Sequence, residues 1–531
     1  MDATQPFFLS ATGTALALLC LLFLLAVMIA ATRNRKRYAG WTRPTRFDRN
    51  IVVIGGGSAG LVTAYIAAAV KAKVTLIEKH RLGGDCLNTG CVPSKALIRS
   101  AKFLSHISRA SEFGCRSASA DFSFAGIMDR VQAIIRTIEP HDSVERYRAL
   151  GVDVIKGAAR IVSPWTVEVK RDNGATERLT TRSIVIAAGA RPFIPSIPGI
   201  DEVGYLTSDN VWDLRELPQR LLVLGGGPIG SELAQAFARL GAADGNKVTQ
   251  VEMAPRLLMR EDPDVSVLVM QRLRAEGITV LVNHTARQFV IENGEKTLIA
   301  EHDGHEVRLP FDAMLVAVGR IANLEGYGLE ALGVATSRTL DTNAFLQTSF
   351  PNIYAAGDVA GPFQFTHAAA HQAWYAAVNA LFEPFKKFKA DYSVIPRVTF
   401  VEPEVASVGL NELEATGQGV AYEVSRYAFD DLDRAILDSE AHGFIKVLTV
   451  PGKDKILGVS IVGEHAGDLI AEYVLAMKQG IGLNVILGTI HAYPTMTEAN
   501  KYVAGVWKKT HAPEKLLAWV ARFHAWRRGS P

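Results

Sequence analysis

Two stretches of this chain repeat one pattern: an apolar strand, a glycine-rich turn, a helix, and a second strand that ends at a glutamate. The first copy begins at Ile51 and the second at Leu221. In such a unit the glycines permit a tight turn and close approach of a pyrophosphate, while the helix start supplies N–H groups and the acid accepts from a ribose hydroxyl. Two copies predict two dinucleotide sites and therefore two cofactors. The positions are Gly55, Gly57, Gly60 and Glu78 in the first copy and Gly225, Gly227, Gly230 and Glu252 in the second.

Two cysteines, Cys86 and Cys91, follow the first copy and are close enough to form a small disulfide ring. Pro93 predicts a helix start, whose N–H groups and dipole stabilise a thiolate at Cys91. A structural disulfide or half of a zinc site is the alternative. No second cysteine pair or Cys/His cluster exists to complete a metal shell, so we predict no metal. The pattern therefore predicts a redox-active disulfide beside a flavin.

Length and charge limit the remaining classes of protein. A chain of 531 residues suggests about three folded units. The net charge of +3 gives no basic face for nucleic acid, and no reading motif is present. Four cysteines are too few for a disulfide-stapled secreted protein and favour a reducing compartment. We expect Cys115 to be a buried, inert thiol.

The uncharged run Phe7–Ala31 is long enough to cross a bilayer. A cleaved secretory signal is the alternative, but no basic region precedes the run and Arg33, Arg35, Lys36 and Arg37 follow it. The positive-inside rule then predicts a single-pass cell-membrane protein whose catalytic domains face the cytoplasm. A basic, aromatic tail at 513–528 predicts an amphipathic helix. It would lie on the membrane surface or pack against the protein's own dimer.

Taken together, residues 50–508 resemble the pyridine nucleotide-disulfide oxidoreductases, the group that contains dihydrolipoyl dehydrogenase, glutathione reductase and mercuric reductase. The resemblance implies that the first copy binds FAD, that the second binds NAD(P)H, with Gly319 also at the cofactor, and that the last domain forms a homodimer. It implies FAD contacts at Gly55, Gly57, Gly60, Glu78, Lys95, Ala159, Gly189 and Asp358.

The predicted fold class is α/β, with two Rossmann-like dinucleotide-binding domains, a C-terminal α+β dimerisation domain and one preceding transmembrane helix. The predicted segments are an anchor and basic linker (1–49), an FAD domain in two parts (50–190 and 323–390), an NAD(P)H domain (191–322), a dimerisation domain (391–510) and a basic amphipathic tail (511–531).

The resemblance also implies separate roles for the two cysteines. Cys91 would be the charge-transfer thiolate next to the flavin, and Cys86 the outer thiol that exchanges with substrate. Lys95 and Glu232 match the family's ion pair near the flavin, where a cation would favour negative charge on the reduced ring. An ordinary interdomain salt bridge is the alternative for this pair.

Glu252 favours NADH as the electron donor, because its carboxylate would accept from a ribose 2′-OH and repel a 2′-phosphate. Arg256 lies close enough in sequence to reverse that preference, and the loop 242–247 looks longer than the family norm. NADPH is therefore the alternative donor.

The chain departs from the family pattern at Tyr493. In dihydrolipoyl dehydrogenase and glutathione reductase the matching residue is a histidine, paired with a glutamate that matches Glu498. A tyrosine, with an ordinary pKa of about 10, is a poor proton shuttle at neutral pH. Mercuric reductase does carry tyrosine there, yet its C-terminal cysteine pair and N-terminal metal-carrying domain are missing here. His491 would either replace the missing histidine or simply be packed.

These features predict an FAD-dependent enzyme that passes electrons from NAD(P)H through the Cys86–Cys91 disulfide to a disulfide, a soft metal ion or a related acceptor. One alternative is a membrane-associated NADH diaphorase or quinone reductase that does not need the cysteines. Another is a redox-responsive binding protein with low turnover.

Overall fold

The computed structural model describes residues 37–383 and 385–529, which belong to two compact units. The first unit combines the chain up to Leu82 with residues 144–189 and 322–390, and the second combines 83–143, 190–321 and the chain from Asp391 onward. The predicted transmembrane segment Phe7–Ala31 lies outside the described residues and stays a prediction. No helix of the described ranges is long and apolar enough to span a membrane.

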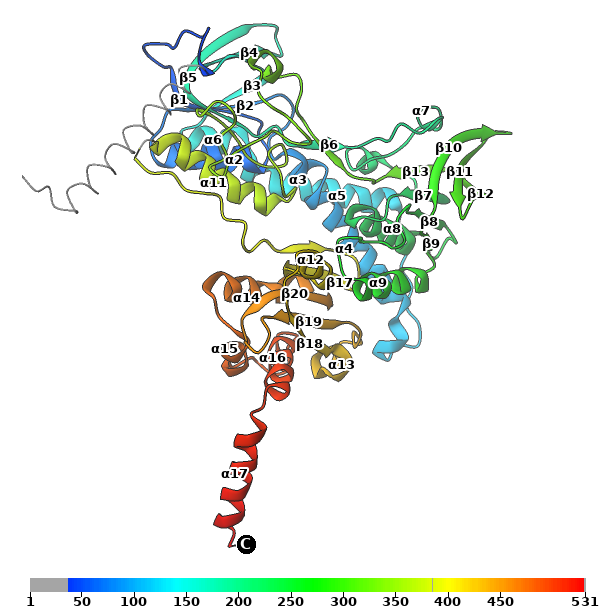
Figure 1. The fold of residues 1–531 in the computed structure, drawn as a ribbon. Helices are drawn as coiled ribbons and strands as arrows, with labels where there is room; N and C mark the ends of the chain where they lie inside the picture. The colour runs from blue at the N-terminus through cyan, green and yellow to red at the C-terminus, as the bar shows by residue number, and fades with distance from the viewer. Residues whose placement is uncertain (1–36, 384, 530–531) are drawn as a thin grey trace, which may run out of the picture. The chain divides into compact units, whose positions relative to one another are not determined.

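The first unit is built on a six-stranded sheet (Figure 1). Its parallel part consists of β1 (Arg49–Ile54), β2 (Val74–Glu78), β5 (Thr176–Ile186) and β15 (Ile353–Ala355). The long strand β3 (Asp153–Ser163) starts parallel to β2 and continues antiparallel to β4 (Thr166–Arg171), which leads back to β5. The β-branched run 51–54 is buried in this sheet, as a parallel strand covered on both faces requires.

Two helices of the first unit, α2 (Ser58–Ala69) and α11 (Thr366–Phe382), pack against each other. Their contact is formed by small side chains, which let the two backbones approach closely. The shared cluster contains Ala64, Ala67, Ala68, Ala369, Ala373 and Ala376. Two shorter helices, α6 (Val144–Ala149) and α10 (Leu329–Leu332), also belong to this unit.

The second unit contains the second copy of the glycine pattern. Its parallel sheet has the order β13 (Ala313–Val316), β7 (Arg220–Leu224), β8 (Lys247–Val251) and β9 (Thr279–Leu281), with helices α8 (Pro228–Gly241) and α9 (Pro263–Ala275). An antiparallel sheet of β10 (Thr285–Glu292), β11 (Glu295–His302) and β12 (His305–Phe311) follows, and the short strands β6 (Ala190–Pro192) and β14 (Arg320–Ala322) pair.

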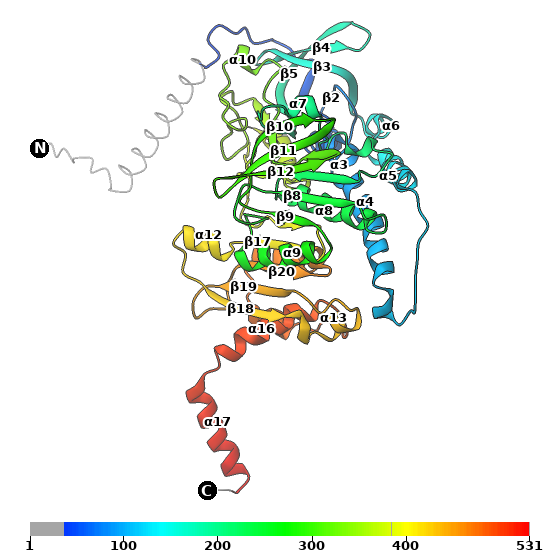
Figure 2. The same cartoon turned by 90° about the vertical axis from the view of Figure 1, so that its right-hand side faces the viewer.

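The same unit ends in a five-stranded sheet (Figure 2). Its order is β16 (Arg397–Thr399), β17 (Glu404–Gly409), β20 (Ile456–Gly463), β19 (Phe444–Thr449) and β18 (Glu423–Ala428), all antiparallel. Helices α14 (Ala466–Gln479) and α16 (Glu498–Thr510) contact these strands. The change from parallel to antiparallel strands confirms the predicted α+β region. Shorter helices here are α12 (Glu412–Gly417), α13 (Asp433–Leu437) and α15 (Leu483–Gly488).

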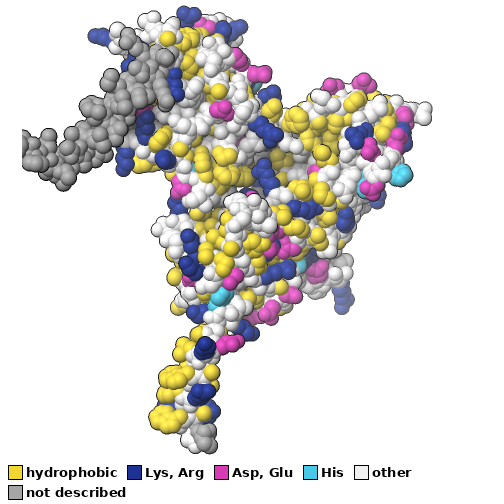
Figure 3. Space-filling view, viewed as in Figure 1, with side chains coloured by type: hydrophobic (Ala, Val, Ile, Leu, Met, Phe, Trp, Pro, Cys, Tyr) yellow, Lys and Arg dark blue, Asp and Glu magenta, His cyan; other side chains and the backbone are white. Residues whose placement is uncertain are grey.

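The predicted helix in the tail is present as α17 (Glu514–Arg527), and none of its side chains is buried. Leu516, Trp519 and Trp526 are 54%, 62% and 73% exposed. Apolar and basic side chains intermingle on the face of this helix that Figure 3 shows. Its role at a membrane surface or in a dimer stays a prediction.

Candidate functional site

Both glycine turns have the same construction. Gly55 (φ +104°) and Gly225 (φ +117°) adopt backbone angles that favour glycine. A Cβ on Gly60 would lie 1.8 Å from the Gly55 carbonyl oxygen, and a Cβ on Gly230 would lie 2.4 Å from the Gly225 carbonyl oxygen. Each helix start therefore packs directly on its turn because no side chain separates them.

The N-termini of α2 and α8 carry no side-chain cap. Gly57 and Gly227 precede these two helices in extended conformation. A Cβ on Gly227 would meet no atom of the chain within 4 Å. The N–H groups and the positive end of each helix dipole are thus suited to a pyrophosphate.

The predicted ribose-binding acids are held identically in the two units. Glu78 accepts hydrogen bonds from the N–H groups of Gly56 and His80, both at 2.6 Å. Glu252 accepts from the N–H groups of Gly226 at 2.6 Å and Ala254 at 2.7 Å. Each carboxylate is therefore fixed between its strand end and its turn, where ribose hydroxyls bind in this type of unit.

Seven of the eight predicted FAD contacts lie in the first unit, and Lys95 lies in the second. Besides the four on the glycine unit, Ala159 is buried on β3, Gly189 (φ +67°) follows β5, and Asp358 follows β15. The carbonyl of Gly189 accepts from the N–H of Asn323 at 3.0 Å. Gly319 (φ +146°) belongs to the second unit, where its carbonyl accepts from the N–H of Phe193 at 2.9 Å.

The two cysteines lie on consecutive helices of the second unit. Cys86 is half-buried in the short α3 (Gly84–Asn88), whereas Cys91 is exposed and is the first residue of α4 (Cys91–Ser108). The turn between them requires Gly90, because a Cβ there would lie 2.9 Å from the carbonyl oxygen of Asp85. The predicted helix start at Cys91 is confirmed, and its dipole favours the thiolate form of this residue.

Contacts that join distant parts of the second unit hold this cysteine turn in place. The Trp212 indole N–H donates to the carbonyl of Thr89 at 2.9 Å. Arg320 donates to the carboxylate of Asp85, the residue before Cys86. Neither contact was anticipated, because no local sequence signal connects residues so far apart in the chain.

The expected ion pair between Lys95 and Glu232 is formed. Lys95 Nζ lies 2.7 Å from Glu232 Oε2 and 4.4 Å from the ring centre of Phe400. The other Glu232 oxygen accepts from the Phe400 N–H at 2.9 Å. Only 5% of Glu232 is exposed, and these two partners compensate the burial of its carboxylate. Whether the pair also acts on a flavin stays a prediction.

Tyr493 is 69% exposed, and its hydroxyl donates to Asp433 at 2.9 Å. The Asp433 carboxylate raises the pKa of the Tyr493 phenol above its ordinary value. Glu498, the expected partner at this position, instead accepts from Tyr502 at 3.1 Å. Sequence reasoning missed Asp433 because it lies on α13, far from Tyr493 in the chain.

His491 is packed, in agreement with the second of the two interpretations above. Its ring nitrogens lie 3.1 Å from Glu472 and 3.1 Å from the carbonyl of Thr489. Its side chain is 7% exposed. The expectation of a buried Cys115 is wrong, since this residue is exposed after the last turn of a short helix at 110–113.

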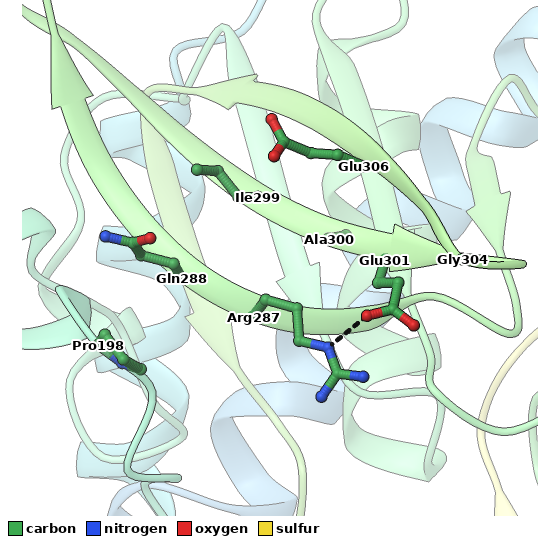
Figure 4. A pocket seen from close by; sticks show the side chains of 8 residues that line it. All are labelled: Pro198, Arg287, Gln288, Ile299, Ala300, Glu301, Gly304 and Glu306. Atoms are coloured by element: carbon green, nitrogen blue, oxygen red, sulfur yellow. Dashed lines mark hydrogen bonds and ion pairs between the residues drawn. The ribbon is translucent and has the colours of Figure 1, made fainter.

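A surface pocket of about 550 Å³ lies over the β10–β12 sheet (Figure 4). Its lining includes Arg287, Glu301 and Glu306, and Arg287 donates to Glu301 at 3.0 Å. None of the predicted site residues lines it, so it is separate from the nucleotide-binding and cysteine positions.

Comparisons with known proteins agree on one family. The family described as pyridine nucleotide-disulphide oxidoreductase matches residues 49–373, and its dimerisation domain matches 395–504. The chain is 34% identical to a mercuric reductase of Staphylococcus aureus, covering 86% of this chain and 82% of that one. It is also 34% identical to the dihydrolipoyl dehydrogenase of Bacillus subtilis, covering 86% and 96%.

Two solved structures are similar over most of the chain. One is the Cu(II) complex of the HOCl-induced flavoprotein disulfide reductase RclA from Escherichia coli, with a TM-score of 0.76, 27% identity, and coverage of 86% of this chain and 99% of that one. The other is LpdA from Mycobacterium tuberculosis, with a TM-score of 0.77, 26% identity, and coverage of 86% and 98%.

Substitutions at Gly227 and Gly230 of the second copy should have different effects, one on nucleotide binding and the other on stability. We expect Gly227→Ala to fold normally but to bind NADH at least about tenfold more weakly, because its methyl group meets no protein atom yet stands where a pyrophosphate approaches. Gly230→Ala should lower the thermal unfolding midpoint, because its methyl group would clash with the Gly225 carbonyl. Nucleotide titration and thermal unfolding measure the two effects. Wild-type NADH affinity in Gly227→Ala would show that this turn does not hold the nucleotide.

Removing Lys95 should destabilise the protein, because it leaves the buried Glu232 carboxylate without its cation. We expect Lys95→Met to cost about 1–3 kcal/mol, since Lys95 itself is partly exposed. Lys95→Met combined with Glu232→Gln should recover much of this loss, because glutamine still accepts from the Phe400 N–H without a charge. Thermal midpoints of the wild type, Lys95→Met, Glu232→Gln and the double variant give the comparison. If the loss in the double variant equals the sum of the losses in Lys95→Met and Glu232→Gln, the two side chains are not coupled.

Proposed function

Because this chain belongs to the pyridine nucleotide-disulphide oxidoreductase family, we propose that it passes electrons from NADH through FAD and the Cys86–Cys91 pair to a soft metal ion bound by thiolates. The relatives are NAD(P)H-dependent flavoprotein oxidoreductases, and FAD with NAD(P)H are the family's cofactors. The choice of NADH and of the acceptor is our proposal.

The observation that carries the proposal is the position of Cys91 at the first residue of α4. A thiolate at a helix N-terminus is stabilised by the dipole and by unpaired N–H groups. Gly90 lets the α3 backbone come close to this helix start, as a short disulfide ring requires. A hydride equivalent delivers two electrons and one proton, and it converts the disulfide into one thiolate and one thiol.

The residues of the first unit fit FAD, since the glycine turn, the uncapped α2 and the fixed Glu78 suit the adenosine diphosphate part. When bound, the flavin supplies the two-electron carrier between nicotinamide and disulfide. Among the chain's own residues, Glu78 would orient the ribose and Asp358 would hold a sugar hydroxyl. Lys95, paired with Glu232, would supply positive charge.

Tyr493 supports a soft metal ion as the acceptor over a disulfide. Its phenol has a raised pKa and is held by Asp433, so it does not take up protons at neutral pH. Thiolates bind soft metal ions without a proton shuttle. The similar mercuric reductases are named for an acceptor of this chemical class.

The contacts of Arg256 support NADH as the donor. Its guanidinium donates to the backbone carbonyls of Glu261 at 2.7 Å and Met259 at 3.1 Å. These bonds engage the guanidinium that lies close to Glu252 in the sequence and that would otherwise be available to a 2′-phosphate. Glu252, in contrast, presents a carboxylate that repels such a phosphate.

Anaerobic titration with NADH tests the role of the cysteines. We expect the wild type to gain, after two electrons, the long-wavelength absorption band of a thiolate next to oxidised flavin. Cys86→Ser should lose this NADH-dependent appearance because it cannot form the disulfide. Cys115→Ser is the control, since Cys115 is an exposed cysteine that lies outside the cysteine pair.

Flavin bleaching without the band in the wild type would contradict the proposal. It would favour the diaphorase alternative, in which a quinone or dye takes electrons directly from the flavin. Lack of steady NADH consumption with mercuric ion, copper ion or disulfides would instead favour the redox-responsive binding protein.

Steady-state kinetics with both nucleotides test the donor. We expect a higher kcat/KM for NADH than for NADPH. Replacing Glu252 by alanine should lower the ratio of kcat/KM for NADH to kcat/KM for NADPH at least about tenfold. This change corresponds to a free-energy difference of about 1.4 kcal/mol. Asp244→Ala, which removes an exposed carboxylate from the loop 242–247, should leave the preference unchanged. A wild-type preference for NADPH would refute the assignment of NADH.

A further inference from the structure

A second cluster of metal-binding side chains lies in the second unit, away from the cysteines. It consists of His106 on α4, Glu402 between β16 and β17, and Glu440 after α13. One ligand atom of each side chain lies within 4.8 Å of the other two. His106 is about 22 Å along α4 from Cys91, at 1.5 Å per residue. The cluster is therefore separate from the redox pair.

Each of the two carboxylates is only half satisfied. Arg239 donates to Glu402 Oε2 at 2.5 Å, and Arg109 donates to Glu440 Oε1 at 2.6 Å. The second oxygens, Glu402 Oε1 and Glu440 Oε2, are buried and accept no hydrogen bond from the described residues. Glu440 Oε2 lies 3.2 Å from His442 Nε2, a contact that is an ion pair only when this imidazole is protonated. Both glutamates are 5% exposed. A buried, unpaired carboxylate oxygen is costly, so these atoms call for a further partner.

The surrounding charges leave room for a cation. Arg239 is also paired with Glu276, Arg109 is also paired with Glu112, and Arg272 contacts Glu276. Four carboxylates therefore share three arginines at this place. A bound divalent cation would offset the remaining negative charge, and it would bind the two oxygens that accept no hydrogen bond.

We propose that His106, Glu402 and Glu440 form a binding site for a divalent transition-metal ion of the zinc class. Imidazole and carboxylate are both ligands for such an ion, whereas Mg²⁺ and Ca²⁺ prefer oxygen ligands alone. Tetrahedral zinc with bonds of about 2.0–2.1 Å sets its ligand atoms roughly 3.4 Å apart, so the side chains must close by about 1.5 Å at most. His442, whose Nε2 lies 3.2 Å from Glu440 Oε2, or a water molecule is available as the fourth ligand.

The ion would join three elements of the second unit. It would connect the C-terminal half of α4 with the segments before β17 and after α13. Since α4 begins at Cys91, the metal would stabilise the helix that positions the redox pair without touching it. Its role is structural, and the site differs from a soft-metal acceptor site at the thiolates.

The test is titration of the full-length, FAD-loaded protein with Zn²⁺ by calorimetry, together with elemental analysis of the purified protein. Both are done in a Cys86→Ser, Cys91→Ser background, so that the thiolates cannot bind the probe. We expect one Zn²⁺ per chain and a raised thermal midpoint, because an ion that binds the folded state stabilises it. Mg²⁺ should not displace the zinc.

Replacing His106 by alanine should weaken this binding at least about 100-fold and abolish the thermal shift. The variant keeps the fold because His106 belongs to none of the ion pairs described above. Glu440→Gln is the second variant, since its amide oxygen still accepts from Arg109 while the anionic ligand is lost. His465→Asn is the matched control, because His465 also lies near two carboxylates but is exposed and outside the cluster.

Two results would overturn the proposal. One is the absence of Zn²⁺ binding in the Cys86→Ser, Cys91→Ser protein, which would mean that water or a proton satisfies the buried oxygens. The other is binding that survives in both His106→Ala and Glu440→Gln, which would locate the ion elsewhere. Absence of NADH-dependent activity in the wild type would contradict the proposed function. It would not affect the zinc-site proposal, which is tested by Zn²⁺ binding alone.

Discussion

The placement of α4 is the constraint on which the rest of the candidate site depends, because Cys91 is its first residue and cannot be positioned independently of the helix. Three ion pairs hold the helix along its length. They are Lys95–Glu232 at 2.7 Å, Lys102–Glu464 at 2.7 Å and Arg109–Glu440 at 2.6 Å. In each pair the acid is largely buried, so losing its partner leaves a charge without compensation. Such pairs favour one arrangement of the helix over others, even where their net contribution to stability is small.

The two nucleotide-binding turns show why the same sequence pattern serves twice. In both, the acid at the strand end binds the N–H of the second turn glycine and an N–H two residues beyond the acid. The acid therefore shapes the turn before any ribose is present. A neutral or shorter side chain would lose the turn contact as well as the ribose contact, which couples the fold of the unit to its binding chemistry.

The sequence predicted features that depend on neighbouring residues and missed contacts between residues far apart in the chain. The glycine turns, the helix start at Cys91 and the change to antiparallel strands after residue 391 depend on neighbouring residues, and the structure agrees with them. The Lys95–Glu232 ion pair could be predicted only from the resemblance to a family, because the two residues are far apart in the chain. The Asp433 contact of Tyr493 has no local signal, because it joins residues of separate elements. Cys115 was misjudged because cysteines are usually buried, whereas this one follows a short surface helix.

The number of protons that each reaction takes up or releases relates Tyr493 to the type of electron acceptor. When a dithiol reduces a disulfide, a thiolate leaves and needs a proton, and a base nearby must also activate the attacking thiol. When two thiols bind a metal ion as thiolates, they release their protons, and the later reduction of the ion consumes electrons alone. Tyr493 is a tyrosine with an ordinary pKa of about 10, which Asp433 raises further, so it is not the base that the first reaction needs at neutral pH. The second reaction requires no such base, so a tyrosine whose hydroxyl donates to Asp433 is compatible with the proposed metal acceptor.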